Sequence, residues 1–143
     1  LYFNEFAGYH WRSVAGRGPG YYIFRKEHLS WHVGAHLTYT YEDQIAGAED
    51  RGYLGARLMT EFDMSSPSGM FHVNYKGELN FDFDETKNLT AEESLLLEHK
   101  FLTFFTAGIL IQHSWDNLPP PGFKHHDFRF TITLGFSWSA RGW

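Results

Sequence analysis

The sequence predicts an all-β protein, an antiparallel up-and-down transmembrane β-barrel with about eight strands. Three observations support this prediction. Apolar and polar residues alternate over several stretches, these stretches are long, and short and longer connections between them alternate. Aromatic residues, which favour strands, make up 19% of the 143 residues. The length suits one barrel domain, residues 1–143, and we expect further sequence upstream of Leu1 in the natural protein.

The clearest alternation lies in residues 70–84, where one face is apolar and the other polar. The first face is Phe71, Val73, Tyr75, Gly77, Leu79, Phe81 and Phe83. The second is His72, Asn74, Lys76, Glu78, Asn80, Asp82 and Asp84. The same period of two recurs in residues 29–42, 53–62 and 128–139, so each stretch reads as a strand with two different faces.

The length of these runs favours a membrane. Several cover 11 to 15 residues, whereas a strand of a globular protein has about 5 to 6. A tilted transmembrane strand needs roughly 9 to 11 residues. The longest largely apolar run, residues 101–111, is too short for a transmembrane helix, which needs about 20.

The expected connections alternate in length. Residues 25–28, 64–69 and 98–100 form the short set, and residues 43–51, 84–88 and 116–126 form the mostly longer set. Outer-membrane barrels have tight periplasmic turns and longer external loops, so we place the second set outside the cell.

Three stretches need separate treatment. Residues 1–6 give a short partial strand. Residues 14–24 carry glycines at alternate positions around Pro19, which predicts a close-packed face with an edge or bulge. Residues 89–102 fit both a strand and a helix with a capping box at Thr90 and Glu93, and we favour the strand because it keeps the up-and-down order.

The C-terminal third carries a Trp-Asp-Asn-x-Pro-x-Pro-Gly loop, a Lys and an Asp, and a strand with Leu-Gly-x-x-Trp. These residues are Trp115, Asp116, Asn117, Pro119, Pro121, Gly122, Lys124, Asp127, Leu134, Gly135 and Trp138. Together with Gly16, Gly18, Gly20 and Tyr21, they resemble the salt-induced outer-membrane proteins, a bacterial β-barrel family of unknown function. The resemblance implies a Gram-negative outer membrane, with lipid and lipopolysaccharide as neighbours.

The polar face is expected to line the barrel lumen. The predicted lumen residues are His32, His36, Arg57, Glu61, His72, Lys76, Glu78, Asp82 and Arg129. Charged residues are rarely buried unless paired, so we expect Arg57, Lys76 and Arg129 to pair with Glu61, Glu78 and Glu42. Since about eight strands leave an interior that side chains fill, the pairs predict a plug, and a wider barrel would hold water.

The composition and the spacing of the histidines argue against a nucleic-acid surface and against a metal site. A net charge of −5 without a basic stripe argues against nucleic acid, and the absence of cysteine excludes thiolate metal sites. His125 and His126 are neighbours that face opposite ways, and His32 and His36 lie about 13 Å apart on a strand, so we expect no metal or other cofactor.

His113 and Ser114 also face opposite ways, so we expect no enzyme. The expected role is structural or interaction-related, in a larger protein assembly if there is one, or porin-like with limited passive permeation. Two alternatives stay open. One is a soluble lipocalin-like carrier whose apolar face lines a ligand cavity, and the other is a small outer-membrane lipid hydrolase.

Aromatic residues near the expected strand ends suggest the girdles of a membrane barrel. They are Trp31, Tyr39, Tyr41, Phe81, Phe83, Trp115, Phe128 and Trp138.

Overall fold

The fold is that of a computed structural model, which describes residues 2–4, 9–44, 50–85, 88–102, 104–119, 122 and 124–136. All regular secondary structure in these ranges is β, as predicted. The strands are β1 (Tyr2–Asn4), β2 (Tyr9–Arg17), β3 (Gly20–Lys26), β4 (Leu29–Gln44), β5 (Arg51–Ser65), β6 (Phe71–Asp82), β7 (Leu89–Leu102), β8 (Phe105–Asp116) and β9 (His126–Phe136).

The strands form one antiparallel sheet in the order β1-β2-β4-β5-β6-β7-β8-β9. Strand β3 also pairs with β4 and continues the register of β2, because Arg17 lies opposite Leu37 and Gly20 opposite Gly34. The two segments therefore occupy one position in an eight-strand sheet, interrupted at Pro19. The backbone oxygen of Pro19 accepts a hydrogen bond of 3.1 Å from Ala35, so the interruption stays attached to β4.

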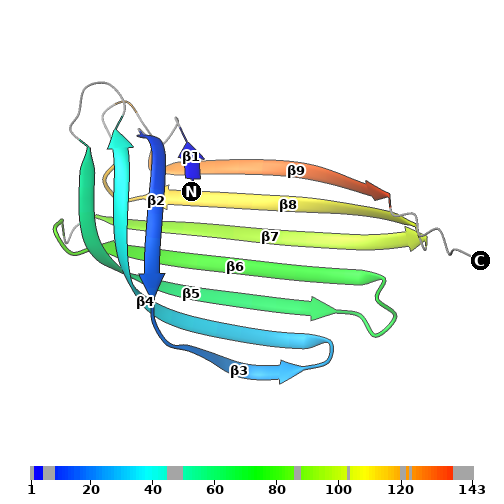
Figure 1. The fold of residues 1–143 in the computed structure, drawn as a ribbon. Helices are drawn as coiled ribbons and strands as arrows, with labels where there is room; N and C mark the ends of the chain where they lie inside the picture. The colour runs from blue at the N-terminus through cyan, green and yellow to red at the C-terminus, as the bar shows by residue number, and fades with distance from the viewer. Residues whose placement is uncertain are drawn as a thin grey trace, which may run out of the picture.

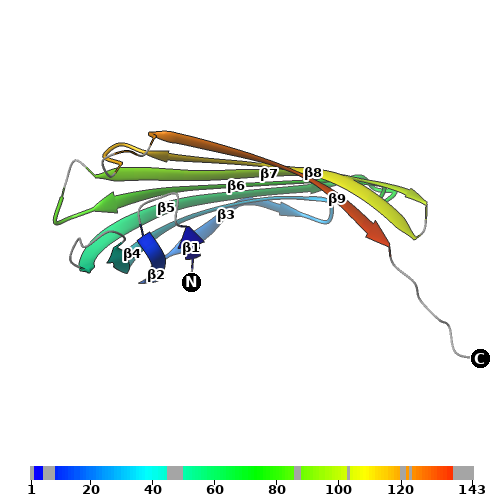
Figure 2. The same cartoon turned by 90° about the horizontal axis from the view of Figure 1, so that it is seen from above.

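The sheet curls into a half-barrel (Figures 1 and 2). Strands β6 to β9 lie side by side, while β2 and the adjoining ends of β4 and β5 turn sharply away from them, at the left of Figure 1. No pairing joins β1 to β9 among the residues described, so the predicted antiparallel barrel is confirmed as far as an eight-strand half-barrel in this part of the chain.

Most connections lie where the sequence predicts them, but one does not. Residues 98–100 belong to β7, and the turn falls between Leu102 and Phe105. The strand interpretation of residues 89–102 is confirmed and the helical one is wrong. Pairing with β6 on one edge and β8 on the other determines the conformation of this segment and overrides its helical spacing.

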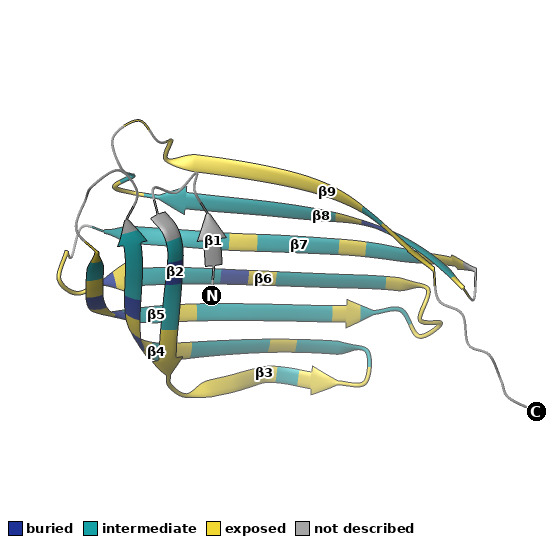
Figure 3. Cartoon of the chain, turned by 45° about the horizontal axis from the view of Figure 1, so that its top comes forward, coloured by how far each residue is buried: buried dark blue, intermediate teal, exposed yellow. Residues whose placement is uncertain are grey.

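The two faces of the sheet differ sharply in exposure at the bend. Along β4, Leu37 is 68% exposed and Tyr39 52%, whereas Thr38 is 6% and Thr40 3% exposed. We call the face of Thr38 and Thr40 the inner face, because the curl encloses it, and the opposite face the outer face. Buried residues gather at this bend (Figure 3), and the buried side chains include Arg12, Thr38, Thr40, Tyr53 and Asp82.

Glycines make the bend sterically possible. A Cβ at Gly16 would lie 2.7 Å from Cγ2 of Thr38, and one at Gly55 would collide with the backbone oxygen of Phe81. Only a residue without a side chain lets these strands approach so closely. The glycine pattern around Pro19 thus marks a close-packed face, as predicted.

We predict that Gly55→Ala lowers the free energy of unfolding by roughly 1 to 3 kcal/mol, because the added methyl group overpacks the bend. Gly135→Ala is the matched control, since its Cβ would meet nothing nearer than 3.8 Å. Urea unfolding followed by tryptophan fluorescence measures both. Equal midpoints for the two variants would contradict a sterically tight bend.

Candidate functional site

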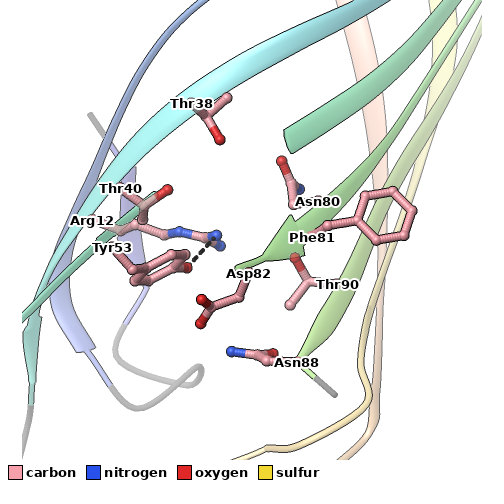
Figure 4. A pocket seen from close by; sticks show the side chains of 9 residues that line it. All are labelled: Arg12, Thr38, Thr40, Tyr53, Asn80, Phe81, Asp82, Asn88 and Thr90. Carbon is pink, nitrogen blue, oxygen red and sulfur yellow. Dashed lines mark hydrogen bonds between the residues drawn. The ribbon is translucent and has the colours of Figure 1, made fainter. Parts of the chain in front are cut away.

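The best-buried polar cluster of the inner face is the polar corner, which we define as Arg12, Glu42, Arg51, Tyr53 and Asp82. Arg12 on β2 lies 3.3 Å from the carboxylate of Glu42 on β4 and donates a 3.1 Å hydrogen bond to the hydroxyl of Tyr53 on β5 (Figure 4). That hydroxyl donates a 3.0 Å hydrogen bond to Glu42. Three strands are therefore joined by one network that is largely shielded from water.

The second half of the polar corner connects β5 to the end of β6. Arg51 lies 2.5 Å from Asp82 and 3.2 Å from Glu85, and its guanidinium stacks 4.8 Å from the ring centre of Tyr53. The other oxygen of Asp82 accepts hydrogen bonds from the backbone N–H groups of Asp84 and Glu85, at 2.8 and 3.1 Å. Asp82 thus fixes the start of the loop after β6, and its carboxylate is compensated on both oxygens.

A small cavity lies at the bend, between side chains of β2, β4 and β5 on one side and side chains from the end of β6 and the start of β7 on the other. Its volume of about 10 Å³ suits a single water molecule. Two buried acceptors that line it, Oδ1 of Asn88 and Oγ1 of Thr90, have no hydrogen-bond partner in the part of the chain described. The cavity is lined by Arg12, Thr38, Thr40, Tyr53, Asn80, Phe81, Asp82, Asn88 and Thr90. A cavity of this size is large enough for one water molecule and too small for a typical ligand.

Two ion pairs cross the middle of the inner face, and their four side chains belong to the set of charged residues that was expected to pair. Arg57 lies 3.0 Å from Glu78 and also donates a 2.8 Å hydrogen bond to Asn80. Lys76 lies 3.0 Å from Glu61. Arg129 and Glu42, the other two members of that set, do not pair with each other, because Glu42 pairs with Arg12 and the strand register places Arg129 opposite Gln112.

A histidine links three strands near the short-turn end of the sheet. Nε2 of His72 lies 2.8 Å from Asp63 on β5, and its Nδ1 lies 3.1 Å from Glu98 on β7. Asn74 donates a further hydrogen bond of 3.1 Å to Asp63. Since a carboxylate only accepts, both contacts are satisfied together when the ring carries two protons and a positive charge.

All nine predicted lumen residues lie on strands whose register puts them on one face. His32 lies opposite Glu61, and His36 lies opposite Arg57. Sequence reasoning missed Arg12, Arg51, Asp63 and Glu98. Arg12 lies outside any clear alternation, and Arg51 falls in a predicted connection. Only the register, which aligns Arg12 with Glu42 and Glu98 with His72, brings them into the site.

The described part of the loop with the family-like motif begins with a turn held by hydrogen bonds. Asp116 accepts a 2.8 Å hydrogen bond from the backbone of Leu118, and the backbone of Asn117 donates one of 3.0 Å to Leu89. Gly122 has φ of 92°, which favours glycine. Asp127 lies opposite Ser114, Pro119 lies in the turn, and Pro121 and Trp138 fall outside the described residues.

The described residues contain no group of three or more His, Cys, Asp or Glu side chains arranged to hold a metal ion. They also contain no helix long and apolar enough to cross a membrane. The register of β7 and β8 places Ser114 opposite Glu92 on the inner face. It places His113 opposite Glu93 on the outer face. The expectation that this chain is not an enzyme stays a prediction.

The chain matches the family described as "Protein of unknown function, DUF481" over residues 1–138. No curated protein and no solved structure shows significant similarity to the chain. Membership of a family of unknown function therefore agrees with the sequence resemblance, while the closer kinship with salt-induced outer-membrane proteins stays a prediction.

We predict that Asp82→Ala destabilises the fold by about 3 kcal/mol, because it removes the buried partner of Arg51 and leaves two loop N–H groups without their acceptor. Glu85→Ala removes the other partner of Arg51, but that side chain is 52% exposed, so the expected change is at most about 0.5 kcal/mol. Urea unfolding gives both values. Equal losses in the two variants would contradict the role assigned to Asp82.

We predict that Arg57→Glu lowers stability more than Lys76→Glu, since the Arg57 side chain is 17% exposed and that of Lys76 is 56% exposed. Adding Glu78→Arg to Arg57→Glu should restore part of the loss, by about 1 kcal/mol, because the charges are exchanged. A double-mutant cycle on unfolding midpoints measures this coupling. A coupling energy of zero would mean that the pair contributes nothing.

Proposed function

Because the chain belongs to the DUF481 family of proteins of unknown function, we infer its role from its own sequence and structure, and we propose that it is a bacterial outer-membrane β-barrel protein. Its proposed neighbours are lipid and lipopolysaccharide. The role we propose is structural or interaction-related, with limited passive permeation at most. The proposal includes kinship with the salt-induced outer-membrane proteins that the hairpin motif resembles.

The observation that carries the proposal is that apolar side chains lie on the outer face of the curled sheet and polar ones on its inner face. Large apolar side chains are exposed on the outer face across the sheet, while the best-buried side chains at the bend are mainly polar or charged. On β9, Phe130, Ile132 and Leu134 are each at least 70% exposed. Monomeric soluble proteins rarely expose an apolar surface of this continuity, whereas a membrane strand turns it to lipid.

Strand length also supports a membrane-spanning sheet. Strands β4 to β9 have 16, 15, 12, 14, 12 and 11 residues. Each therefore reaches the roughly 9 to 11 residues that a tilted transmembrane strand requires.

Exposed aromatic rings lie near both ends of the strands. Phe71, Phe101, Phe104 and Phe136 lie near the short-turn end, and Phe81, Phe83 and Phe128 near the long-loop end. Two rows of aromatic side chains at opposite ends of the outer face fit the two interfaces of a bilayer.

The proposal requires that the free edges of the sheet be paired in the membrane, because unpaired backbone groups are not tolerated in hydrocarbon. Successive strands in the sheet order are antiparallel, so β1 and β9 run in opposite directions. Their edges thus suit antiparallel closure, either with each other or through further strands.

The arrangement of the inner face argues against the lipocalin-like alternative. A carrier of apolar ligands needs an apolar cavity. Here the inner face carries the polar corner, the two central ion pairs and the His72 cluster. These side chains also occupy space that a wide aqueous channel would need, which supports a structural role over rapid permeation.

The direct test is membrane partition of the full-length natural protein in a Gram-negative host. We expect it in the outer-membrane fraction, released only by detergent. A monodisperse protein in detergent-free buffer would overturn the proposal in favour of a soluble carrier. Release of acyl chains from lipopolysaccharide by the purified protein, detected by mass spectrometry, would instead favour the hydrolase.

Permeation is tested separately in planar bilayers. We predict conductance far below that of an open aqueous pore for the wild-type protein, because paired side chains occupy the inner face. Large, stable conductance steps in the wild type would contradict a filled interior and favour a porin-like role.

A further inference from the structure

A polar group of residues lies within the apolar surface of the outer face and extends to its long-loop end. Its members come from four neighbouring strands: Tyr75 on β6, Glu93 on β7, His113 on β8 and His126 on β9. Strand pairing places His113 opposite Phe128, two residues after His126 on the same face of β9. His126 is the first residue of β9 and His113 lies three residues before the end of β8, so the two histidines are at the rim of the sheet, where water and ions reach them, while Glu93 and Tyr75 lie further toward its middle.

The two histidines direct nitrogen atoms at each other. Nε2 of His113 lies 3.1 Å from Nδ1 of His126, with the ring planes only 10° apart. Two nitrogens bound to one metal ion at about 2.0 to 2.1 Å lie about 2.9 Å apart at the right angle of a tetragonal Cu²⁺ site and about 3.3 Å apart at the tetrahedral angle of a Zn²⁺ site. The observed separation lies between these two values, so rotation of the imidazole rings would bring both lone pairs onto a shared ion.

The remaining nitrogen of His113 faces a carboxylate. Its Nδ1 lies 3.4 Å from Oε2 of Glu93, and the other oxygen of Glu93 lies 3.3 Å from the hydroxyl of Tyr75. A histidine that binds a metal usually donates its other ring N–H to a carboxylate, which fixes the tautomer and leaves the ligating nitrogen free of a proton. Glu93 is positioned to do this for Nε2 of His113.

Packing fixes the His113 ring as well. It stacks on Phe128 at 4.3 Å between ring centres, with an angle of 15° between the planes. The ring is thus held by an aromatic face and directed by a carboxylate before any ion arrives. His72, by contrast, has both ring nitrogens in contact with carboxylates, whereas His113 directs one nitrogen at a second histidine.

We propose that His113 and His126 form a surface binding site for a divalent transition-metal ion, with Cu²⁺ preferred and Zn²⁺ weaker. Imidazole suits both ions, and Cu²⁺ lies at the top of the usual affinity order. For both facing nitrogens to bind the ion, the proton between them moves from Nδ1 to Nε2 of His126, so each ring binds as a neutral imidazole through the nitrogen that faces the other ring. Two protein ligands leave the other coordination positions to water, so the site is an exchangeable one. It does not depend on the membrane proposal.

The test is isothermal titration of the folded, detergent-solubilised protein with CuCl₂, using a chain without a polyhistidine tag. We expect one tight equivalent for the wild type and at least about tenfold weaker binding for His113→Gln and for His126→Gln. Glu93→Gln should weaken binding about tenfold through loss of the carboxylate behind His113. His125→Gln is the matched control, because Nδ1 of His125 contacts the backbone oxygen of Asp116, and its affinity should stay within about twofold.

Electron paramagnetic resonance of the wild type with one equivalent of Cu²⁺ tests the site without relying on a variant that folds. The spectrum should show coupling to two imidazole nitrogens. An absence of tight binding, coupling to fewer than two nitrogens, or an equal loss of affinity in His125→Gln and His126→Gln would each overturn the proposal.

Discussion

The shape of this protein depends on how the buried charges of Arg12 and Asp82 are compensated where the sheet bends. Arg12 and Asp82 are 7% and 4% exposed, and each has a partner of opposite charge within hydrogen-bonding distance. A buried charge without such a partner costs several kcal/mol, so the bend is stable only with both pairs in place. Tyr53 lies between them, hydrogen-bonded to Arg12 and stacked under Arg51, and so couples the two halves.

The polar corner also explains how a single curved sheet can turn its apolar face outward. A soluble β-protein gains stability by burying apolar side chains, but here the outer face leaves them uncovered. The inner face is held by ion pairs, hydrogen bonds and close glycine contacts at Gly16 and Gly55. In the proposed membrane location, lipid surrounds these exposed apolar side chains and so contributes to the stability of the fold. This connects the local chemistry of the bend to the proposed membrane location.

Much of the sheet could be predicted because a period of two is a strong local signal. The two faces of β6 were evident in residues 70–84, and the charged side chains could be assigned to one face, whereas the specific pairing of Arg57 with Glu78 and of Lys76 with Glu61 depends on the strand register. The glycines around Pro19 correctly marked a close-packed interruption. These features depend on side-chain type and spacing along one segment.

Features that depend on the register between strands could not be predicted from the sequence in the same way. The salt bridge of Arg12 to Glu42 and the pairing of His113 with His126 join residues from different strands, and a shift of one residue would turn each side chain to the other face. The end of β7 was misplaced because Glu98 and Lys100 resemble turn residues, whereas Glu98 is held by His72 across the strand pair. Curvature was also hidden, since it arises from contacts between β2, β4 and β5.

The central claim is that the outer face contacts lipid and the inner face does not, and neighbouring positions on β8 test it most directly. Ile109 lies on the outer face and Leu110 on the inner face, and both are apolar, so hydrophobicity alone does not distinguish them. The chain has no cysteine, so single-cysteine variants at these positions can each carry one environment-sensitive fluorophore in vesicles that contain a lipid-borne quencher. The account predicts strong quenching at residue 109 and weak quenching at residue 110. Equal quenching at both positions, or the reverse order, would contradict it.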